Sequence, residues 1–162
     1  MKVLRLAKEN LDLFASVVQQ FGEVHAPVEQ NGKHVFKRLS LWSEARLNYQ
    51  RTVLPPKKYF LPPSDTLFEY KEGEGYVARQ PDASRRIILF GVHPYDMAAI
   101  LQMDVVFAEG NPDIHYLERR RNATIVVCDV QNASENVFAG CMGTAVLESG
   151  GDVLVTRVGS AY

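Results

Sequence analysis

The 162-residue chain has little cysteine, no long apolar run and no excess of charge of either sign. Two cysteines, Cys128 and Cys141, cannot build the disulfide framework of a small secreted domain, so we expect a reducing, cytoplasmic compartment. No stretch reaches the roughly 18 consecutive apolar residues of a membrane span. A formal net charge of −1 with interspersed signs argues against a nucleic-acid partner, which would favour a concentrated excess of Lys and Arg.

Several signature motifs of cofactor and metal sites are also missing. The chain has no Gly-Lys-Ser/Thr phosphate loop and no Gly-x-Gly-x-x-Gly fingerprint. It has no Cys-x-x-Cys or His-x-x-x-His pair, so spacing gives little support for a zinc site among Cys128, Cys141, His93 and His115. The glycine-spaced segment 140–144 predicts a tight turn.

The first half of the chain has the patterns of a helix and two hairpins. Apolar residues at i, i+3, i+4 and i+7 predict an amphipathic helix that ends at Gly22; they are Leu11, Phe14, Ala15 and Val18. Asn31-Gly32 lies at the centre of a predicted β-hairpin over residues 23–39, because both residues tolerate positive φ. Residues 66–70 and 75–78 predict a second antiparallel pair.

Between these hairpins the chain predicts less regular structure. Residues 41–49 are interpreted as a short helix that carries Trp42. Two Pro-Pro pairs flank residues 57–61, and proline both fixes φ and removes a hydrogen-bond donor. We therefore expect that segment to run extended over the surface.

The second half predicts a strand–helix–strand crossover. Residues 86–92 form a near-continuous apolar run, typical of a strand buried on both faces, and Pro94 begins a helix that runs to Gly110. Asn111 is expected to cap a second helix, whose basic run 119–121 lies at its negative end. Residues 123–130 then predict a parallel strand.

These elements predict an α/β (α+β) fold: an amino-terminal helix and antiparallel hairpins, then a βαβ crossover in a small mixed sheet. Residues 1–162 are expected to form a single domain, with a last strand at 152–157. Ligands of such sheets bind outside the carboxyl ends of the strands. A site is therefore expected between the loops 91–96 and 128–132.

The residues of those loops allow two interpretations. His93, Asp96 and Cys128 could form a catalytic set in a small cofactor-binding enzyme. Alternatively, Cys128 is a buried small hydrophobe, and Asp96 is a first-turn residue that interacts with the helix dipole. The spacing matches no known nucleophile signature, so residue chemistry alone predicts a loop cluster without a reaction.

The order of motifs resembles one family. Residues 89–100 resemble an "FGVRPCDxxAI" motif, residues 107–121 its "F-x-E-G … Y…RR" continuation, and residues 135–144 the motif "xxCFCxSMGT". Residues 57–68 are similar to that family's "K-x-FLFP…LF" stretch. The family comprises the iron–sulfur beta subunits of cytoplasmic sulfhydrogenases, their counterparts in anaerobic sulfite reductase and related dicluster ferredoxin proteins.

The resemblance implies a role in electron relay. Members pass electrons between flavin or nicotinamide subunits and a catalytic partner such as a hydrogenase, and an amino-terminal domain like this one precedes two Cys-rich [4Fe–4S] motifs. It further implies oxidoreductase partner subunits and no catalytic residue in this chain. We therefore expect residues 1–162 to be a truncated amino-terminal part of a longer iron–sulfur protein.

The family's cluster cysteines, however, are replaced. Where the family has cysteine, this chain has Tyr95, Val130, Val137 and Ala139, whereas Cys141 replaces a serine and Cys128 lies two residues before the expected ligand. Clusters are ordinarily held by four thiolates, and apolar side chains cannot substitute for them. The resemblance thus implies a degenerate cluster site without metal, and 4Fe–4S clusters in a carboxyl-terminal part or in partner subunits.

Overall fold

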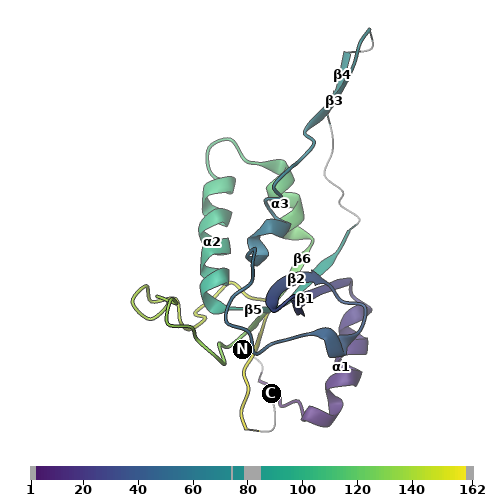
Figure 1. The fold of residues 1–162 in the computed structure, drawn as a ribbon. Helices are drawn as coiled ribbons and strands as arrows, with labels where there is room; N and C mark the ends of the chain where they lie inside the picture. The colour runs from purple at the N-terminus through teal and green to yellow at the C-terminus, as the bar shows by residue number, and fades with distance from the viewer. Residues whose placement is uncertain (1–2, 74, 79–84, 160–162) are drawn as a thin grey trace.

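The computed structural model describes residues 3–73, 75–78 and 85–159, and its centre is a five-stranded mixed sheet (Figure 1). The strands are β1 (Glu23–Gln30), β2 (Lys33–Arg38), β5 (Ile87–Val92), β6 (Ala123–Cys128) and β7 (Val153–Val155), in the spatial order β2-β1-β5-β6-β7. β1 pairs antiparallel with β2 and parallel with β5. The pairs β5–β6 and β6–β7 are parallel, which confirms the predicted crossover and fold class.

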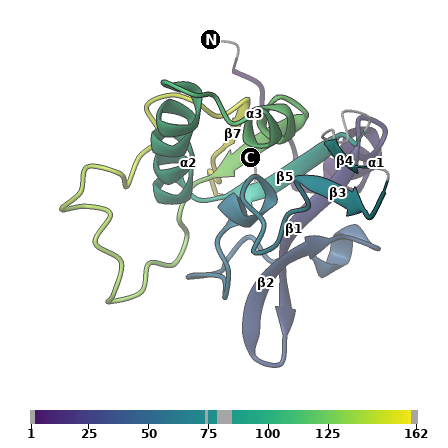
Figure 2. The same cartoon turned by 90° about the horizontal axis from the view of Figure 1, so that it is seen from above.

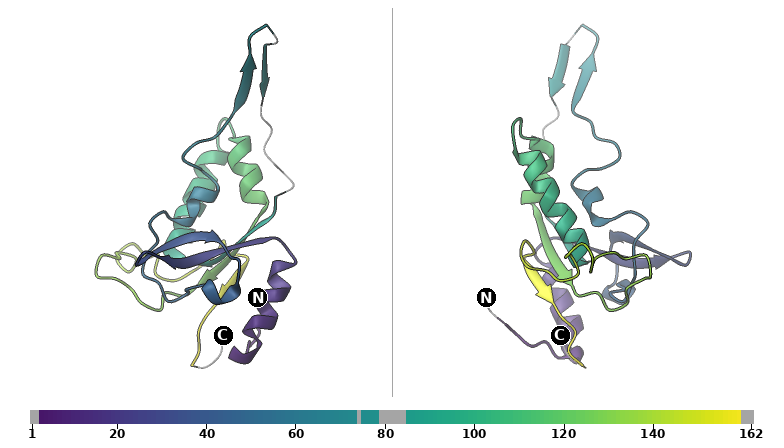
Figure 3. Two further views of the ribbon diagram at one scale, coloured as in Figure 1. Left: turned by 45° about the vertical axis from the view of Figure 1, so that its right-hand side comes forward. Right: turned by 90° about the vertical axis from the view of Figure 1, so that its left-hand side faces the viewer.

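Helices cover both faces of the sheet. α2 (Pro94–Ala108) and α3 (Ile114–Arg121) cover one face, and their buried residues join those of β5 and β6 in one apolar cluster. α1 (Leu11–Gln19), which follows a 3-10 turn η1 (Lys8–Asn10), packs on the opposite face (Figures 2 and 3). No helix in the described ranges is long and apolar enough to cross a membrane.

The alternation of β5 side chains between the two faces of the sheet is interrupted at Gly91. Ile87 and Leu89 belong to the cluster under α2 and α3, whereas Ile88 and Phe90 belong to the cluster under α1. Gly91 has φ +85°, and the pairing with β6 shifts register between Phe90 and the following Val92. Because of this bulge, Val92 returns to the cluster of Leu89 instead of alternating away from it.

The two predicted hairpins are confirmed. Asn31 and Gly32 connect β1 to β2 with φ values of 52° and 70°, the positive-φ pair that an Asn-Gly turn favours. The second hairpin consists of β3 (Phe68–Lys71) and β4 (Gly75–Ala78), a separate two-stranded sheet. It projects away from the rest of the molecule (Figures 1 and 3).

Two segments between the hairpins differ from expectation. Only Trp42–Glu44 is helical within residues 41–49, as the 3-10 turn η2, because Ala45 turns back to bridge Val28 of β1. Residues 57–61 are not an extended surface strand. Their first part forms the 3-10 helix η3 (Pro56–Tyr59), which places Phe60 in the core with no exposed surface.

Two helix boundaries also differ. Gly22 lacks the positive φ of a C′ glycine; instead a side chain there would lie 2.7 Å from the Arg86 carbonyl oxygen, so close strand approach requires glycine. α3 begins after Asp113 rather than at Asn111, because the Asp113 carboxylate accepts a hydrogen bond from the Tyr116 backbone N–H at 3.0 Å. The basic residues 119–121 occupy its last turn as predicted.

Candidate functional site

The carboxyl ends of β5 and β6 meet at one edge of the sheet, because the two strands are parallel neighbours. His93 follows β5 directly, and Cys128 is the last residue of β6. The edge is closed by Tyr49, which lies between η2 and η3 in the chain and has 1% of its surface exposed. The Tyr49 hydroxyl donates a hydrogen bond of 2.8 Å to the Gly91 carbonyl.

His93 is fully buried at this edge and stacks on Tyr49, with 3.9 Å between ring centroids and 6° between planes. Its Nδ1 contacts the Tyr95 hydroxyl, which in turn lies 2.8 Å from the Gln50 carbonyl oxygen. A tyrosine hydroxyl has one proton, and Tyr95 donates it to Gln50, so Nδ1 of His93 must be the donor to Tyr95. Nε2 is therefore unprotonated, and it is buried without a hydrogen-bond partner among the described residues.

Burial determines the charge states at this edge. It lowers the pKa of His93 to about 4, because the protonated ring would lose its hydration. It raises the pKa of Asp96, in the first turn of α2, to about 6, although nearby Lys57 opposes the shift. At neutral pH the edge therefore has a neutral imidazole and an ionised, partly buried carboxylate.

Cys128 faces the other side of the sheet. It belongs to the apolar cluster under α1, whereas Tyr49 belongs to the cluster under α2 and α3. Burial raises the pKa of the Cys128 thiol to about 12, and neighbouring Asp129 contributes to the rise. A protonated thiol is a poor nucleophile, and Nε2 of His93, the nitrogen that could accept the thiol proton, makes no hydrogen bond to Cys128 or to any other described residue. The arrangement therefore does not activate Cys128 as the catalytic interpretation requires.

A small pocket of about 40 Å³ adjoins Cys128, bounded by the chain near Leu47 and by Asp129, Val155 and Arg157. This volume is comparable to that of one water molecule in the liquid. The pocket therefore has room for a solvent molecule beside the thiol, and not for an organic cofactor.

The remaining predicted site residues follow β6 in the chain. Val130 is partly buried just beyond β6, and the following segment extends outward beside α2 (Figure 2). In that segment Ala139 is buried and Val137 partly buried, whereas Cys141 is exposed in the predicted tight turn, which the Thr144 N–H closes by donating to the Ala139 carbonyl at 2.8 Å. Both cysteines are free thiols.

The donor set does not fit a [4Fe–4S] cluster held by this chain alone. Such a cluster needs about four thiolates, and the whole sequence has two cysteines. Of these, Cys128 is a buried thiol with a raised pKa and Cys141 is exposed in a separate turn. Within the described ranges, no three His, Cys, Asp or Glu residues are grouped so that they could hold a metal ion.

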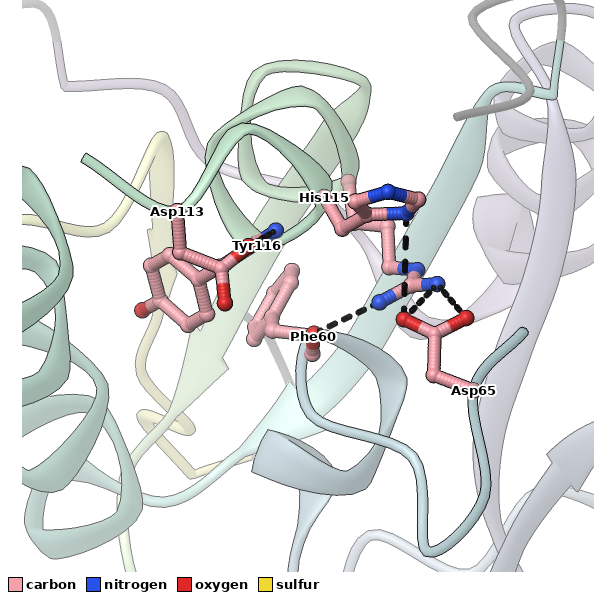
Figure 4. Close-up of polar contacts among 6 residues, drawn as sticks. Phe60, Asp65, Asp113, His115 and Tyr116 are labelled. Carbon is pink, nitrogen blue, oxygen red and sulfur yellow. Dashed lines mark hydrogen bonds and ion pairs between the residues drawn. The ribbon is translucent and has the colours of Figure 1, made fainter. Parts of the chain in front are cut away.

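A second polar cluster, not recognised in the sequence, fixes the base of the β3–β4 hairpin (Figure 4). Nη2 of Arg119 on α3 donates to both carboxylate oxygens of Asp65, each at 2.7 Å, and its Nη1 lies 3.4 Å from the Phe60 carbonyl oxygen. Nδ1 of His115 lies 3.8 Å from Asp65. The hydrogen bond from Arg119 lowers the pKa of Asp65. β3 begins three residues later, so this ion pair attaches the hairpin to the body.

Comparison with known proteins gives a clear relative. The chain is 32% identical over 155 residues to the sulfhydrogenase 2 subunit beta of Pyrococcus furiosus. The match covers 96% of this chain but 45% of the relative, so the chain spans less than half of the relative's length. No family model and no solved structure matches the chain.

The buried His93 predicts a specific pH dependence of stability. The imidazole has a pKa of 6.5 when unfolded and about 4 when folded, so the unfolded chain binds more protons between these values. The stabilisation by neutral His93 is fully present above pH 6.5 and is lost as pH falls to 4, by about 3 kcal/mol. The free energy of unfolding, measured by urea denaturation, should show this loss in the wild type relative to His93→Phe.

Asp96 titrates in the wild type and in His93→Phe alike, so its contribution to the pH dependence cancels when the two free energies of unfolding are subtracted. A difference between wild type and His93→Phe that stays constant from pH 7.5 to pH 4 would show that His93 is not a buried neutral imidazole.

The two thiols should differ sharply in reactivity. In the folded chain, Cys141 is exposed and Cys128 is 5% exposed with a pKa of about 12, so iodoacetamide should alkylate Cys141 alone at pH 8. Peptide mass spectrometry identifies the modified residue. The variant Cys141→Ser should remain unmodified until urea unfolds it, and rapid alkylation of Cys128 in that folded variant would contradict the assigned burial.

Proposed function

Because this chain belongs, along nearly its whole length, to the sulfhydrogenase beta subunit family, we propose that it is a non-catalytic domain of an iron–sulfur electron-transfer subunit, acting in the cytoplasm. Its role is to dock cluster-bearing or flavin-bearing subunits of an oxidoreductase complex. The observation that carries this proposal is the 32% identity over 96% of the chain. At that coverage the similarity includes the sheet, the edge at His93 and the β3–β4 hairpin.

The composition of the sheet edge supports a docking role rather than a redox role for these residues. Tyr95 stands where the resemblance places a cluster cysteine, and its hydroxyl is bonded to His93 and Gln50. Ala139, at another such position, is a buried small side chain. A phenol and a small apolar group at positions where the resemblance places thiolates support a degenerate cluster site. The clusters are assigned to polypeptide outside these residues, or to partner subunits.

The β3–β4 hairpin is the surface that suits docking. In its register Phe68 is opposite Ala78 and Tyr70 is opposite Tyr76, so these four side chains share one face. Phe68, Tyr70 and Tyr76 are 62%, 70% and 75% exposed. Aromatic side chains contribute most to the free energy of folding or binding when they are removed from water. A hairpin of two strands is marginally stable by itself. An apolar surface of a partner protein would cover the aromatic face and stabilise the hairpin.

Metal content tests the assignment of clusters to other polypeptides. The chain purified without oxygen should contain neither stoichiometric iron nor acid-labile sulfide, and should lack visible absorption, because two cysteines cannot supply four thiolates. Folding is checked in the same sample by circular dichroism. Stoichiometric iron and sulfide with a brown chromophore, lost in Cys128→Ser, would contradict the proposal.

Adjacent hairpin residues allow a matched test of docking. Tyr76 lies on the aromatic face and Val77 on the opposite face, and they are 75% and 69% exposed. A tagged chain isolated without oxygen from its native cells should retain iron- or flavin-containing oxidoreductase subunits. Tyr76→Ser should lower their recovery about tenfold or more, as expected for an aromatic hot spot, and Val77→Ser should leave it unchanged.

The hairpin test has two contradicting outcomes. Equal losses in Tyr76→Ser and Val77→Ser would show that the aromatic face is not the contact. Recovery of proteins that contain neither iron, labile sulfide nor flavin would contradict the electron-transfer assignment itself.

A further inference from the structure

An open groove of about 620 Å³ lies at the end of the sheet where β1 and β5 begin, opposite the edge at His93. Its basic side chains come from segments that are distant in the sequence: Arg38 ends β2, and Arg85 and Arg86 immediately precede β5. The wall also contains Phe21, whose side chain is 68% exposed. The proposed electron-transfer role uses none of these residues.

One carboxylate holds two of the three guanidinium groups in place. Glu23 Oε2 lies 3.2 Å from Nη2 of Arg85, and Glu23 Oε1 lies 3.5 Å from Nη1 of Arg38. Oε2 also lies 3.5 Å from Nε2 of the buried His25, whose Nδ1 contacts the Tyr59 hydroxyl at 3.0 Å. The two guanidinium groups therefore converge on one carboxylate at the groove, while both arginine side chains remain more than half exposed to solvent.

The third arginine is held nearby through its backbone. The Glu23 N–H donates to the Arg86 carbonyl at 3.0 Å, and Gly22 packs so closely on that carbonyl that a Cβ would lie 2.7 Å from it. The Arg86 side chain is exposed and makes no ion pair or hydrogen bond within the described residues. Three guanidiniums and one carboxylate leave two positive charges in the groove.

The groove is therefore electropositive in a chain whose net charge is −1. The carboxyl end of α1 contributes Gln19 and Gln20 to the wall, and a helix end of this kind carries about half a negative charge. That partial negative charge lowers the net positive charge of the groove but does not change its sign. A phosphate monoester carries about −1.5 to −2 charges at pH 7 and accepts forked hydrogen bonds from guanidinium groups.

We propose that this groove binds a phosphate ester with an organic body, its phosphate on Arg38, Arg85 and Arg86. The volume lies within the range of small-molecule sites, about 300–1,000 Å³, and exceeds what a phosphate alone would fill. Phe21 offers an exposed ring against which a planar base can stack. The ligand class is a nucleoside phosphate or a sugar phosphate, which share the phosphate and differ in the base.

Binding can be measured on the chain alone, so the result is independent of any partner protein. Inorganic phosphate, ribose 5-phosphate and adenosine monophosphate are titrated at low ionic strength, with amide shifts followed by NMR and heats by calorimetry. Saturable shifts should appear at the amides of Gly22, Glu23 and Ser40, which line the groove. Added salt should weaken binding, because the contacts are charged.

Arg86→Gln should weaken binding of the phosphate esters about tenfold or more, as expected when a hydrogen bond to a charged group is lost. Arg51→Gln is the matched control, because Arg51 is also exposed and lies outside the groove. Tighter binding of adenosine monophosphate than of ribose 5-phosphate, abolished in Phe21→Ala, would identify a nucleotide. Equal affinities of the two esters, both tighter than that of inorganic phosphate, would identify a sugar phosphate, and equal affinities of all three probes would contradict a ligand with an organic body. The absence of saturable binding by all three probes, or an equal loss in Arg51→Gln, would overturn the site.

Discussion

The parallel ladder between β5 and β6 is the contact on which the other elements depend. All six residues of β5 are buried, so their backbone groups have no access to water and must pair with β1 and β6. Both faces of the strand also need apolar cover, which α2 and α3 supply on one side and α1 on the other. A parallel connection in turn requires a long crossover. Burial of β5 between two parallel neighbours thus explains why helices cover both faces of the sheet and why a long segment connects β5 to β6. It also explains why the strand ends lie together at two opposite edges of the sheet.

The sequence correctly predicts those elements whose conformation depends on the residues within them. The Asn31-Gly32 turn, the buried run of β5 and the start of α2 at Pro94 all follow from the conformations that those residues allow. The failures occur where distant contacts decide. Phe60 enters the core, with Arg120 5.7 Å above its ring, and this pulls the preceding residues into a 3-10 helix despite the flanking prolines. No local pattern encodes that contact.

The candidate sites show the same division. Parallel strand order was enough to predict that His93 and Cys128 lie near one edge, because both end adjacent strands. It could not predict that Cys128 joins the cluster under α1, or that Tyr49 of the opposite cluster stacks on His93 from a loop. The groove at the opposite edge was missed because Arg38 and Arg86 are 48 positions apart and meet only through strand pairing. Its one local signal, the pair Arg85-Arg86 before an apolar run, is common on protein surfaces.

Gly91 has a consequence for how this sequence can diverge. Its φ of +85° strains other residues, and even the methyl group of alanine would lie 2.8 Å from a Leu47 side-chain carbon, so replacement of this glycine should destabilise the fold. Its carbonyl also receives the Tyr49 hydroxyl. The side chains around it are restricted in a different way, because Tyr95 is held by hydrogen bonds and Cys128 by burial rather than by backbone conformation. A substitution at Tyr95 or Cys128 therefore alters individual side-chain contacts, whereas a substitution at Gly91 would alter the backbone bulge that positions Val92 and the residues after it.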